Sequence, residues 1–420
     1  MTTVDFRTRF RGSEVALDAA AFCDDTLPSL LTENGRLAAR GYSLLELTPL
    51  GLEIGDARYT LVSDGDTLAV RAGLDDDAVV AVLTPDAFSE LVQETSTTLG
   101  LGMRGRVEMR RGTMDEFVAW EPVLRALFDG RPVHEAGMVE LLDADGTELD
   151  LHGSFTLSDP HEQIGEFLAA AGFVKIRDVF EPDEMSTIVD DLADAVAEAR
   201  RDDGQSWWAR DGKGEWYAAR ILAFNEKSPT LRKLLLDERF EQLGALTDDR
   251  FEQRDPDNSD AAEGLTKHLG VTDGISDLPW HKDCSPGGHS YGCCGLTVGI
   301  CLTPADRDSG ELGVVAGSHR ANVQGAGVRA GLDLPRVPLP AETGDVTIHC
   351  SCTLHMSRPP VARERRVVYT GFGLAPRPGD VVQRVDRDAI RRARADLDDA
   401  GRRLNVRGYG NAVQQFDLDG

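Results

Sequence analysis

The stretch that decides the fold of the second half of the chain is GDVTIHCSCTLHMSRPPVARERRVVYTGFGL, from Gly344 to Leu374. It holds two runs rich in β-branched and aromatic residues, GDVTIHCSC and RRVVYTGFGL, with Pro359 and Pro360 between them. Two similar short runs, GLTVGICLTPA and GELGVVAG, come before it and are divided by Gly, Pro and Asp. Many short strands with such punctuation predict a barrel or jelly roll after about residue 270.

The bulk properties of the chain predict two globular domains. Its 420 residues exceed the length of one ordinary domain, and 41% hydrophobic residues are enough for a substantial core. The formal net charge of −27 disfavours nucleic acid and anionic membrane surfaces as partners. The sequence has no apolar run of about 18 residues, so we expect no membrane span.

The cysteines and the N-terminus predict a cytoplasmic protein. The first residues, MTTVDFRTRFRGSEV, lack the apolar core of a signal peptide. Seven cysteines, an odd number, in a long chain without an export signal indicate reduced thiols.

The first 150 residues alternate strand and helix signals in an α+β pattern. A hairpin is expected over Tyr59–Gly73, with its turn at Asp64 and Gly65. The run AVVAVLTPDAFSELVQETS predicts a strand and then a helix, and MRGRVEMRRG predicts another strand. A helix is expected from a capping box at Thr113 and Glu116 to Gly130. The last expectation is a hairpin around Asp145 and Gly146.

We expect the first domain to span residues 1–150. The rest of the sequence predicts a second domain over 151–375 and a linker with a charged helical tail over 376–420. SFTLSDPHEQIGEFLAAAGFVKIRDVF predicts a helix and a strand, and PTLRKLLLDERFEQLGALT predicts a helix. EPDEMSTIVDDLADAVAEARR predicts a long helix with acids in its first turn and bases in its last. APRPGD (375–380) is typical of a linker, and DRDAIRRARADLDDAGRRL predicts a charged helix.

A metal site is the strongest functional signal. His281 and Asp283 are two residues apart, so on a strand they point to the same side and can bind one ion together. His355, 72 residues further on and near another predicted strand, offers a third ligand. Two His and one carboxylate form the facial triad of non-haem Fe(II) oxygenases, which leaves positions open for a co-substrate. The same three residues also suit Zn²⁺.

A cation downstream of His355 strengthens the iron interpretation. Arg366 lies eleven residues after it, within the apolar stretch RRVVYTGFGL, where a guanidinium fork suits a bidentate grip on a carboxylate. Ser357 could add a hydroxyl. We expect the neighbouring Arg363 and Arg365 to be surface charges. A metal with open positions beside a carboxylate grip fits the chelation of a 2-oxo acid.

Residues from about 165 to 375 resemble the phytanoyl-CoA dioxygenase family of Fe(II)- and 2-oxoglutarate-dependent oxygenases. The matching motifs are GFVKIRDVFEPDEM, WHKD, DSGELGVVAGSHR and GDVTIHCSCTLHMSRPPVARERR. The resemblance implies a double-stranded β-helix that uses O₂ to convert 2-oxoglutarate to succinate and CO₂ while a small organic substrate is oxidised. It implies Fe(II) held by His281, Asp283 and His355. It also implies 2-oxoglutarate bound through Arg366 and Ser357, with Trp280 and Thr297 as further lining residues.

Two details refine this resemblance. Halogenating relatives lack the carboxylate that Asp283 supplies, so hydroxylation or a related oxidation is expected here. The family often has Gly after the distal His and Asn nearby, whereas this chain has Met356 and the pair Pro359 and Pro360. The difference concerns the shape of the loop and leaves the ligand in place.

Other side chains near the motif have simpler interpretations. His289, Cys284, Cys293 and Cys294 form a poor zinc site, because no CxxC pair occurs and adjacent cysteines on a strand face opposite ways. We expect the cysteines to be small buried apolar residues. His319 is expected to be a structural loop residue, and His349 is a candidate neighbour of the metal ligands.

The segment DGQSWWARDGKGEWYAARILAFNEKSP suggests either a packed long loop or a lid over the site. Its three Trp, Tyr217 and Arg220 are the residues that would face a substrate.

The stretch from about 45 to 130 resembles a sterol-carrier-protein-2-like domain in its order of hairpin, strand, helix, strand and closing helix. The resemblance implies an apolar tunnel and a lipid-like or acyl-carrying substrate. A scaffold or dimerisation domain without a ligand is the other interpretation. For the whole chain, the alternatives to an oxygenase are a lipid-binding carrier with a degenerate oxygenase domain and a zinc hydrolase. The sequence leaves the oligomeric state open.

Overall fold

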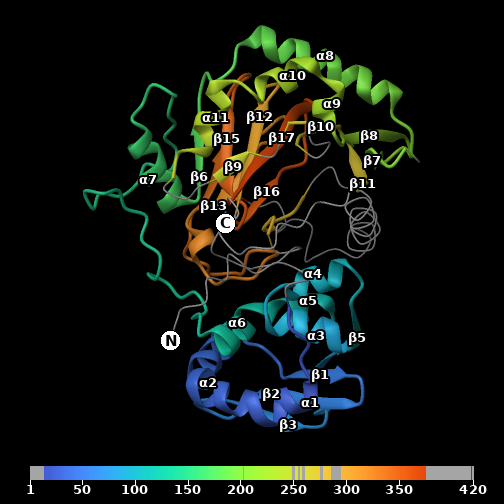
Figure 1. Cartoon of the computed structure of the whole chain (residues 1–420), viewed down its shortest axis with the longest axis vertical. Helices are drawn as coiled ribbons and strands as arrows, with labels where there is room; N and C mark the ends of the chain where they lie inside the picture. The colour runs from blue at the N-terminus through green and yellow to red at the C-terminus, as the bar shows by residue number, and fades with distance from the viewer. Residues whose placement is uncertain are drawn as a thin grey trace. The chain divides into compact units, whose positions relative to one another are not determined.

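A computed structural model describes residues 14–201, 203–247, 251–253, 256–257, 261–274, 278–284, 295–374 and 418. The chain forms two compact units, and Figure 1 shows their elements. One unit comprises Met1–Val139, His281–Gly292 and Arg320–Asp333. The other comprises Glu140–Trp280, Cys293–His319 and Leu334–Gly420. Each unit has a hydrophobic core of its own.

The first unit is built on a five-stranded sheet of order β3-β2-β1-β4-β5. Strands β1 and β4 run parallel and the other neighbours run antiparallel, so this part is α+β as predicted. The strands are β1 (Leu50–Ile54), β2 (Ala57–Ser63), β3 (Leu68–Ala72), β4 (Val79–Leu83) and β5 (Val107–Arg111). The helices are α1 (Ala19–Ala21), the π-helix η2 (Phe22–Thr26), α2 (Leu27–Leu44), α3 (Pro85–Val92), α4 (Thr98–Met103), α5 (Met114–Ala119) and α6 (Glu121–Asp129).

The local signals of this unit are largely confirmed. Strands β2 and β3 form the predicted hairpin, and Ser63 pairs with Leu68 across its turn. The capping box of Thr113 and Glu116 opens α5. The single helix expected as far as Gly130 is two helices, because Pro122 starts a new first turn after Trp120. The hairpin expected around Asp145 is reduced to one isolated bridge between Leu142 and Glu148. The resemblance to a sterol-carrier-protein-2-like domain stays a prediction.

A cluster of buried charges, which we call the Arg125 cluster, fixes helix α6. The Arg125 side chain is fully buried, with its Nε 3.2 Å from Glu121 Oε1 and its Nη1 3.2 Å from Asp129 Oδ2. Arg131 pairs with Asp129 at 2.8 Å and with the buried Glu94. Burial raises the pKa of Glu121, although Arg125 and the backbone N–H of Thr98 oppose the rise. Removing one partner from such a cluster leaves an uncompensated buried charge and destabilises the fold strongly.

The second unit centres on a large antiparallel sheet of order β11-β7-β8-β10-β17-β12-β15-β6, with β9 paired to β17. Its strands are β6 (Phe173–Ile176), β7 (Ser206–Asp211), β8 (Trp216–Ile221), β9 (Phe251–Gln253), β10 (Glu263–Lys267), β11 (Val271–Gly274), β12 (Gly295–Cys301), β15 (Val346–Cys350) and β17 (Arg365–Leu374). A smaller sheet of order β14-β13-β16 contains β13 (Leu312–Val315), β14 (Arg336–Leu339) and β16 (His355–Ser357). The short 3₁₀ helix η3 (Ser318–Arg320) follows β13. The fold is the predicted double-stranded β-helix.

Helices cover one face of the large sheet, as Figure 1 shows. They are α8 (Pro182–Glu198), α9 (Phe224–Lys227), α10 (Pro229–Leu234) and α11 (Glu238–Gly244). Helix α7 (His161–Ala171) lies beside β6, where Phe167 contacts Phe173. Phe240 of α11 stacks on Phe372 of β17 with ring centroids 5.0 Å apart. Val298, Val368 and Phe372 therefore share the helix-covered face, and the residues between them point to the opposite face.

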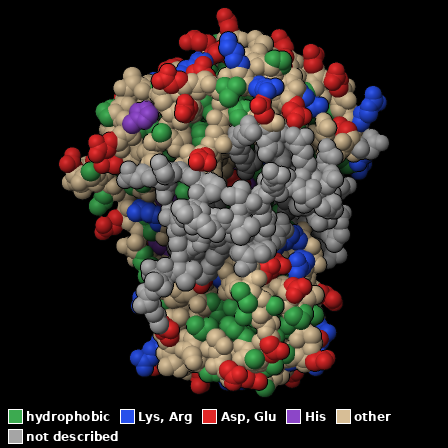
Figure 2. All heavy atoms as spheres, viewed as in Figure 1, with side chains coloured by type: hydrophobic (Ala, Val, Ile, Leu, Met, Phe, Trp, Pro, Cys, Tyr) green, Lys and Arg blue, Asp and Glu red, His purple; other side chains and the backbone are tan. Residues whose placement is uncertain are grey.

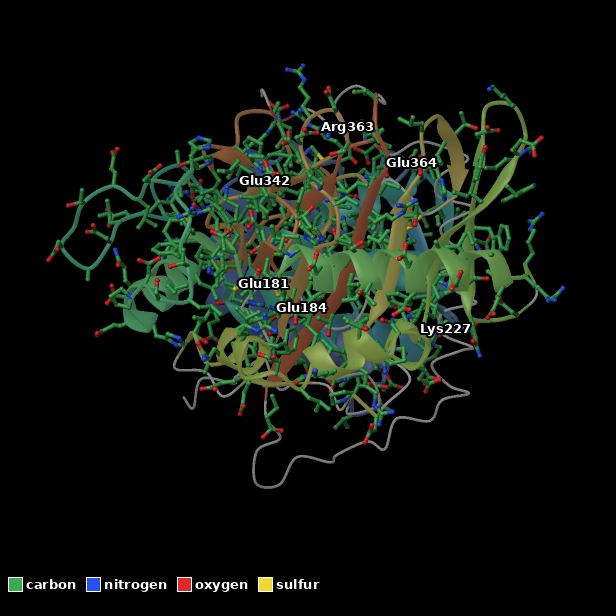
Figure 3. All side chains as sticks on the ribbon, turned by 90° about the horizontal axis from the view of Figure 1, so that it is seen from above. Glu181, Glu184, Lys227, Glu342, Arg363 and Glu364 are labelled. Atoms are coloured by element: carbon green, nitrogen blue, oxygen red, sulfur yellow. The ribbon has the colours of Figure 1, made fainter. Side chains whose placement is uncertain are left out.

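Helix α8 corrects one expectation. Glu181 and Glu184 form a capping box at its N-terminal end, where Figure 3 labels both. The helix ends at Glu198 and has no basic residue in its last turn. Arg200 and Arg201, expected to end the helix, follow it instead. The helix predicted over 229–247 is likewise two helices, α10 and α11.

The Trp-rich segment is a β-hairpin and not a long loop. Strands β7 and β8 pair antiparallel, and β8 joins the large sheet through β10. Trp207 lies opposite Arg220, whose guanidinium sits 4.9 Å from the centre of the Trp207 ring.

The surface and the tail complete the description. Figure 2 shows Asp and Glu side chains spread over the face in view, in keeping with the net charge of −27. Among the helices that the structure describes, none has the length and hydropathy to cross a membrane. The predicted linker at 375–380 and the predicted charged helix beyond it lie outside the described residues.

Candidate metal centre

The segment that carries the first two predicted ligands alternates in burial. Trp280 is 1% exposed and Lys282 is fully buried, whereas His281 and Asp283 are more open. Trp280 and Lys282 point into the core, so His281 and Asp283 lie on the more open side of the segment. The segment is pinned by a bridge between His281 and Ala326 rather than by a full strand.

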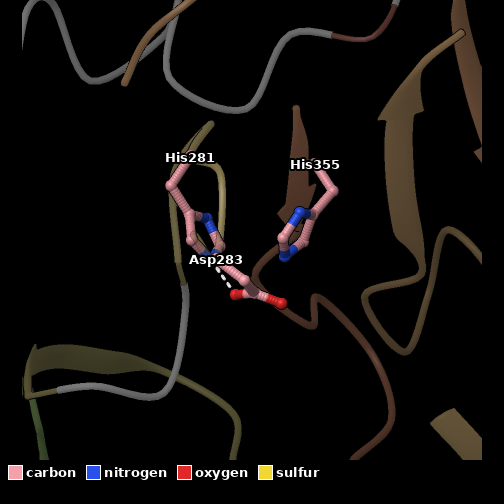
Figure 4. Close-up of side chains that lie close together, drawn as sticks. All are labelled: His281, Asp283 and His355. Atoms are coloured by element: carbon pink, nitrogen blue, oxygen red, sulfur yellow. Dashed lines mark ion pairs between the residues drawn. The ribbon is translucent and has the colours of Figure 1, made fainter. Parts of the chain in front are cut away.

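The three predicted ligands come together. His281, Asp283 and His355 each offer a ligand atom, and these atoms lie within 4.8 Å of one another. His281 Nε2 is 3.4 Å from Asp283 Oδ1, and Figure 4 shows the His355 ring facing the same point. His355 is the most enclosed of the three, at 6% exposure, and lies on β16.

A hydrogen bond selects the His355 nitrogen that can bind a metal. Nδ1 of His355 lies 2.9 Å from the carbonyl oxygen of Thr353. Because a carbonyl only accepts, Nδ1 must carry the proton. The lone pair of Nε2 is then available, and the bond to Thr353 fixes the ring orientation, as is usual for metal-binding His.

The donor set fits a divalent metal. N and O donors that bind one ion from the same side at about 2.0–2.2 Å are about 3 Å apart, so side chains whose ligand atoms lie within 4.8 Å of one another can reach one ion by closing up to about 2 Å. Two imidazoles and one carboxylate on one side of an ion are the donor set of non-haem iron sites.

Two buried cations converge on Ser357, two residues after His355. Nζ of Lys267 donates to the Ser357 hydroxyl at 2.7 Å and to the Ser357 carbonyl at 3.1 Å. Nη2 of Arg365 donates to the same hydroxyl at 2.9 Å. Lys267 is fully buried and Arg365 is 3% exposed. The two residues are opposite each other across β10 and β17, so both point away from the face that α8, α9, α10 and α11 cover. We call this second face the helix-free face because those four described helices cover the other one.

Arg365, and not Arg366, therefore contacts the predicted Ser357. The expectation that Arg365 is a surface charge is wrong, because β17 turns it inward. Arg366 lies on the face shared by Val368 and Phe372, and its guanidinium, about one-third exposed, is 4.0 Å from Glu364. Arg363 is a surface charge as expected, paired with Asp306 and half exposed, and Figure 3 labels it with Glu364.

Thr297 lies on the helix-free face of β12. It pairs with His349 across β12 and β15, and its hydroxyl is 3.2 Å from that of Ser351. His349 is 1% exposed, and its ring centroid lies 4.1 Å from that of His355.

The remaining candidates are structural or lie outside the description. His319 Nε2 donates to the Ala169 carbonyl at 2.9 Å, which suits a loop residue. Cys301, Cys350 and Cys352 are buried, and burial raises the pKa of the Cys301 thiol to about 12. Cys284 is partly buried. His289, Cys293 and Cys294 lie outside the described residues.

Sequence reasoning missed Lys267. It also noted Arg220 without a partner, and the structure supplies one: Arg220 Nη1 is 2.9 Å from Glu263 Oε2. Arg220 and Leu265 are opposite each other across β8 and β10, and Leu265 in turn pairs with Val367. Arg220 is therefore on the same helix-free face as Lys267 and Arg365. The strand register shows that these three cations lie on one face, and the sequence alone does not give this register.

The fold and the triad define a double-stranded β-helix with a candidate metal centre. Residues 168–367 form a domain of the phytanoyl-CoA dioxygenase (PhyH) family, whose family model matches them. No curated protein matches the chain.

Several solved structures are similar to part of the chain. AviO1 from Streptomyces viridochromogenes Tue57 is 21% identical, with a TM-score of 0.41 over 52% of this chain and 98% of AviO1. The epimerase SnoN, solved with Fe³⁺, α-ketoglutarate and nogalamycin RO, is 19% identical, with a TM-score of 0.41 over 54% and 91%. HygX from Streptomyces hygroscopicus, solved with nickel and 2-oxoglutarate, is 17% identical, with a TM-score of 0.36 over 50% and 85%.

Proposed function

We propose that the chain is an Fe(II)- and 2-oxoglutarate-dependent dioxygenase that hydroxylates, or otherwise oxidises, a small organic substrate. The observation that carries the proposal is the triad of His281, Asp283 and His355 together with the buried cations Lys267 and Arg365 that contact Ser357, two residues after His355. A bound Fe(II) would supply the activation of O₂, with release of succinate and CO₂.

The protein residues then have distinct tasks. His281, Asp283 and His355 would hold the ion from one side and leave the other side to the 2-oxo acid end of the co-substrate. Arg365 would bind its distal carboxylate with charge-assisted hydrogen bonds, beside the Ser357 hydroxyl that it contacts. Lys267, whose ammonium donates to Ser357 and to the Arg358 carbonyl, would hold Ser357 in place. Burial of both cations strengthens these bonds and makes them costly to leave unmatched.

The complete carboxylate at Asp283 supports an oxidising enzyme over a carrier with a degenerate domain. We propose hydroxylation as the outcome, and a lipid-like or acyl substrate from the predicted character of the first domain. A zinc hydrolase would use the same ligands, so the identity of the metal separates these two functions.

The test uses the full chain, purified and loaded with Fe(II) without oxygen. Addition of 2-oxoglutarate is expected to give the charge-transfer absorption of a 2-oxo acid on Fe(II), and admission of O₂ is expected to give succinate. Candidate substrates are then scored by how far they stimulate succinate release. Metal occupancy without co-substrate binding, or a purified protein that holds zinc and hydrolyses esters, would refute the proposal.

A further inference from the structure

The connection between β13 and β14, residues 320–333, contacts two parts of the chain that are far apart in sequence. At one side it meets residues 281 and 282, which include the first predicted metal ligand. At the other it meets residues 122–137, which contain most of α6 and the chain after it. All three parts belong to the first compact unit.

The side toward the metal ligands is held by backbone bonds. His281 forms an antiparallel bridge with Ala326, and the N–H of Lys282 donates to the Gly325 carbonyl at 2.9 Å. The buried ammonium of Lys282 reaches the Ala321 carbonyl at 3.4 Å. These contacts fix the backbone on both sides of the His281 Cα, and hence the direction of its side chain.

The side toward α6 is held by two buried polar side chains. The amide of Asn322, which is 3% exposed, donates to the Pro122 carbonyl at 2.9 Å and to the Arg131 carbonyl at 3.0 Å. The Asp333 carboxylate accepts from His134 Nε2 at 2.7 Å and from the Gly137 N–H at 2.9 Å. Burial opposes ionisation of Asp333, but the Gly137 and His134 bonds outweigh it and lower its pKa.

The backbone that receives Asn322 is itself held by buried ion pairs. Pro122 lies in the first turn of α6, and Arg131 follows the helix directly. Arg131, Asp129 and Arg125 belong to the buried Arg125 cluster, which holds both ends of the helix. A shift of this backbone would break largely buried charge pairs at a high cost in free energy, so the 320–333 segment contacts a strongly held part of the chain.

We propose that the N-terminal part of the chain positions His281 and Asp283 through residues 320–333, with Asn322 as the principal positioning residue. This inference rests on the proposed metal site. Outer-shell contacts of this kind typically change metal affinity by about 10–100-fold when they are lost. Binding of a molecule to residues 122–137 would act on the metal ligands through the same contacts.

The test compares Asn322→Ala with Asn34→Ala in the full-length protein. Both changes remove an Asn amide that donates to a carbonyl of α6, because Asn34 Nδ2 bonds the Leu127 carbonyl at 3.0 Å. Asn34 is in α2 and makes its bond near the opposite end of α6 from Pro122. The first readout is hydrogen exchange of the Lys282 N–H in metal-free protein, and the second is Co²⁺ affinity without 2-oxoglutarate.

We expect Asn322→Ala to speed exchange at Lys282 by about tenfold or more, because two buried hydrogen bonds are lost. We expect it to weaken Co²⁺ binding by about tenfold, while Asn34→Ala leaves both quantities within about twofold. Wild-type exchange at Lys282 in a folded Asn322→Ala protein, or equal effects of the two variants, would overturn the inference. Exchange is measured without metal, so it decides the coupling even if the wild type binds no ion, a result that would count against the proposed function alone.

Discussion

The ring of His349 lies against the ring of His355, with centroids 4.1 Å apart and planes tilted by 45°. The Thr353 carbonyl already orients His355 through its Nδ1. The ring of His349 packs against the His355 ring and limits its rotation. The two contacts together restrict the His355 ring to the orientation that presents Nε2.

Replacing His349 by Ala is expected to lower Co²⁺ affinity by about tenfold, because the His355 ring gains freedom to turn. His349→Phe keeps a ring in the same place, and its affinity is expected to stay within about threefold of the wild type. Isothermal titration of metal-free protein measures both. An equal loss of Co²⁺ affinity in His349→Ala and His349→Phe would show that ring packing at position 349 does not determine metal affinity.

Asp283→Ala is expected to abolish coupled succinate formation and to weaken Fe(II) binding by at least about tenfold, since one of three protein ligands is gone. The matched control is Asp66→Ala, an exposed acid in the turn between β2 and β3. Metal content and succinate are measured side by side. Full turnover by Asp283→Ala would contradict the triad.

Steady-state kinetics with 2-oxoglutarate can show which of the two arginines at the start of β17, Arg365 or Arg366, binds the co-substrate. Arg365→Met is expected to raise the KM for 2-oxoglutarate by about 10–100-fold, because it removes a charge-assisted hydrogen bond. Lys267→Met is expected to raise this KM as well, because Ser357 loses the bonds that hold it beside Arg365. Arg366→Met, the control, removes a guanidinium that is one-third exposed and is expected to change KM by less than about threefold. A larger rise in KM for Arg366→Met than for Arg365→Met would show that Arg366 binds the distal carboxylate, as its spacing of eleven residues from His355 predicts.

Acid is expected to loosen the contact between α8 and α11. Hydrogen bonds from the Arg239 side chain and backbone lower the pKa of Asp237 to about 2, and the same guanidinium lowers the pKa of Glu184. A depressed pKa stabilises the fold above the unfolded value of about 4, and that stability is lost as pH falls from about 4 to 2.

The unfolding temperature of Asp237→Asn should therefore fall less steeply over this range than that of the wild type. Asp56→Asn, at an exposed turn, is the control. Parallel curves for wild type and Asp237→Asn would contradict the assignment.

Gly344→Ala is expected to destabilise the fold by more than about 2 kcal/mol. Gly344 has a φ of +89°, and an added Cβ would lie 2.1 Å from the Phe180 carbonyl oxygen. Gly146→Ala, at a φ of +79° with nothing within 4 Å, tests the conformational cost alone and is expected to cost about 1 kcal/mol. Urea unfolding measures both, and equal costs would exclude the close contact as the cause.

Local patterns predicted the elements and the ligands because their causes are local. The capping box at Thr113 and the pair His281 and Asp283 depend on spacings of three and two residues. Lys267 was missed because its partner Ser357 is 90 residues away and its neighbours carry no signal. Arg365 was mistaken for a surface charge because three arginines stand together, and only the pairing of β17 with β10 decides which one turns inward.

The alternation of Trp280, His281, Lys282 and Asp283 also limits how this family of sequences can vary. Substitutions nearby keep the phase of the backbone, but one inserted or deleted residue between Leu278 and Asp283 would exchange the two sets of side chains. The imidazole and carboxylate would then point into the core, and an indole and an ammonium would face the ion. The length of this segment is therefore constrained as tightly as the identity of its two candidate ligands.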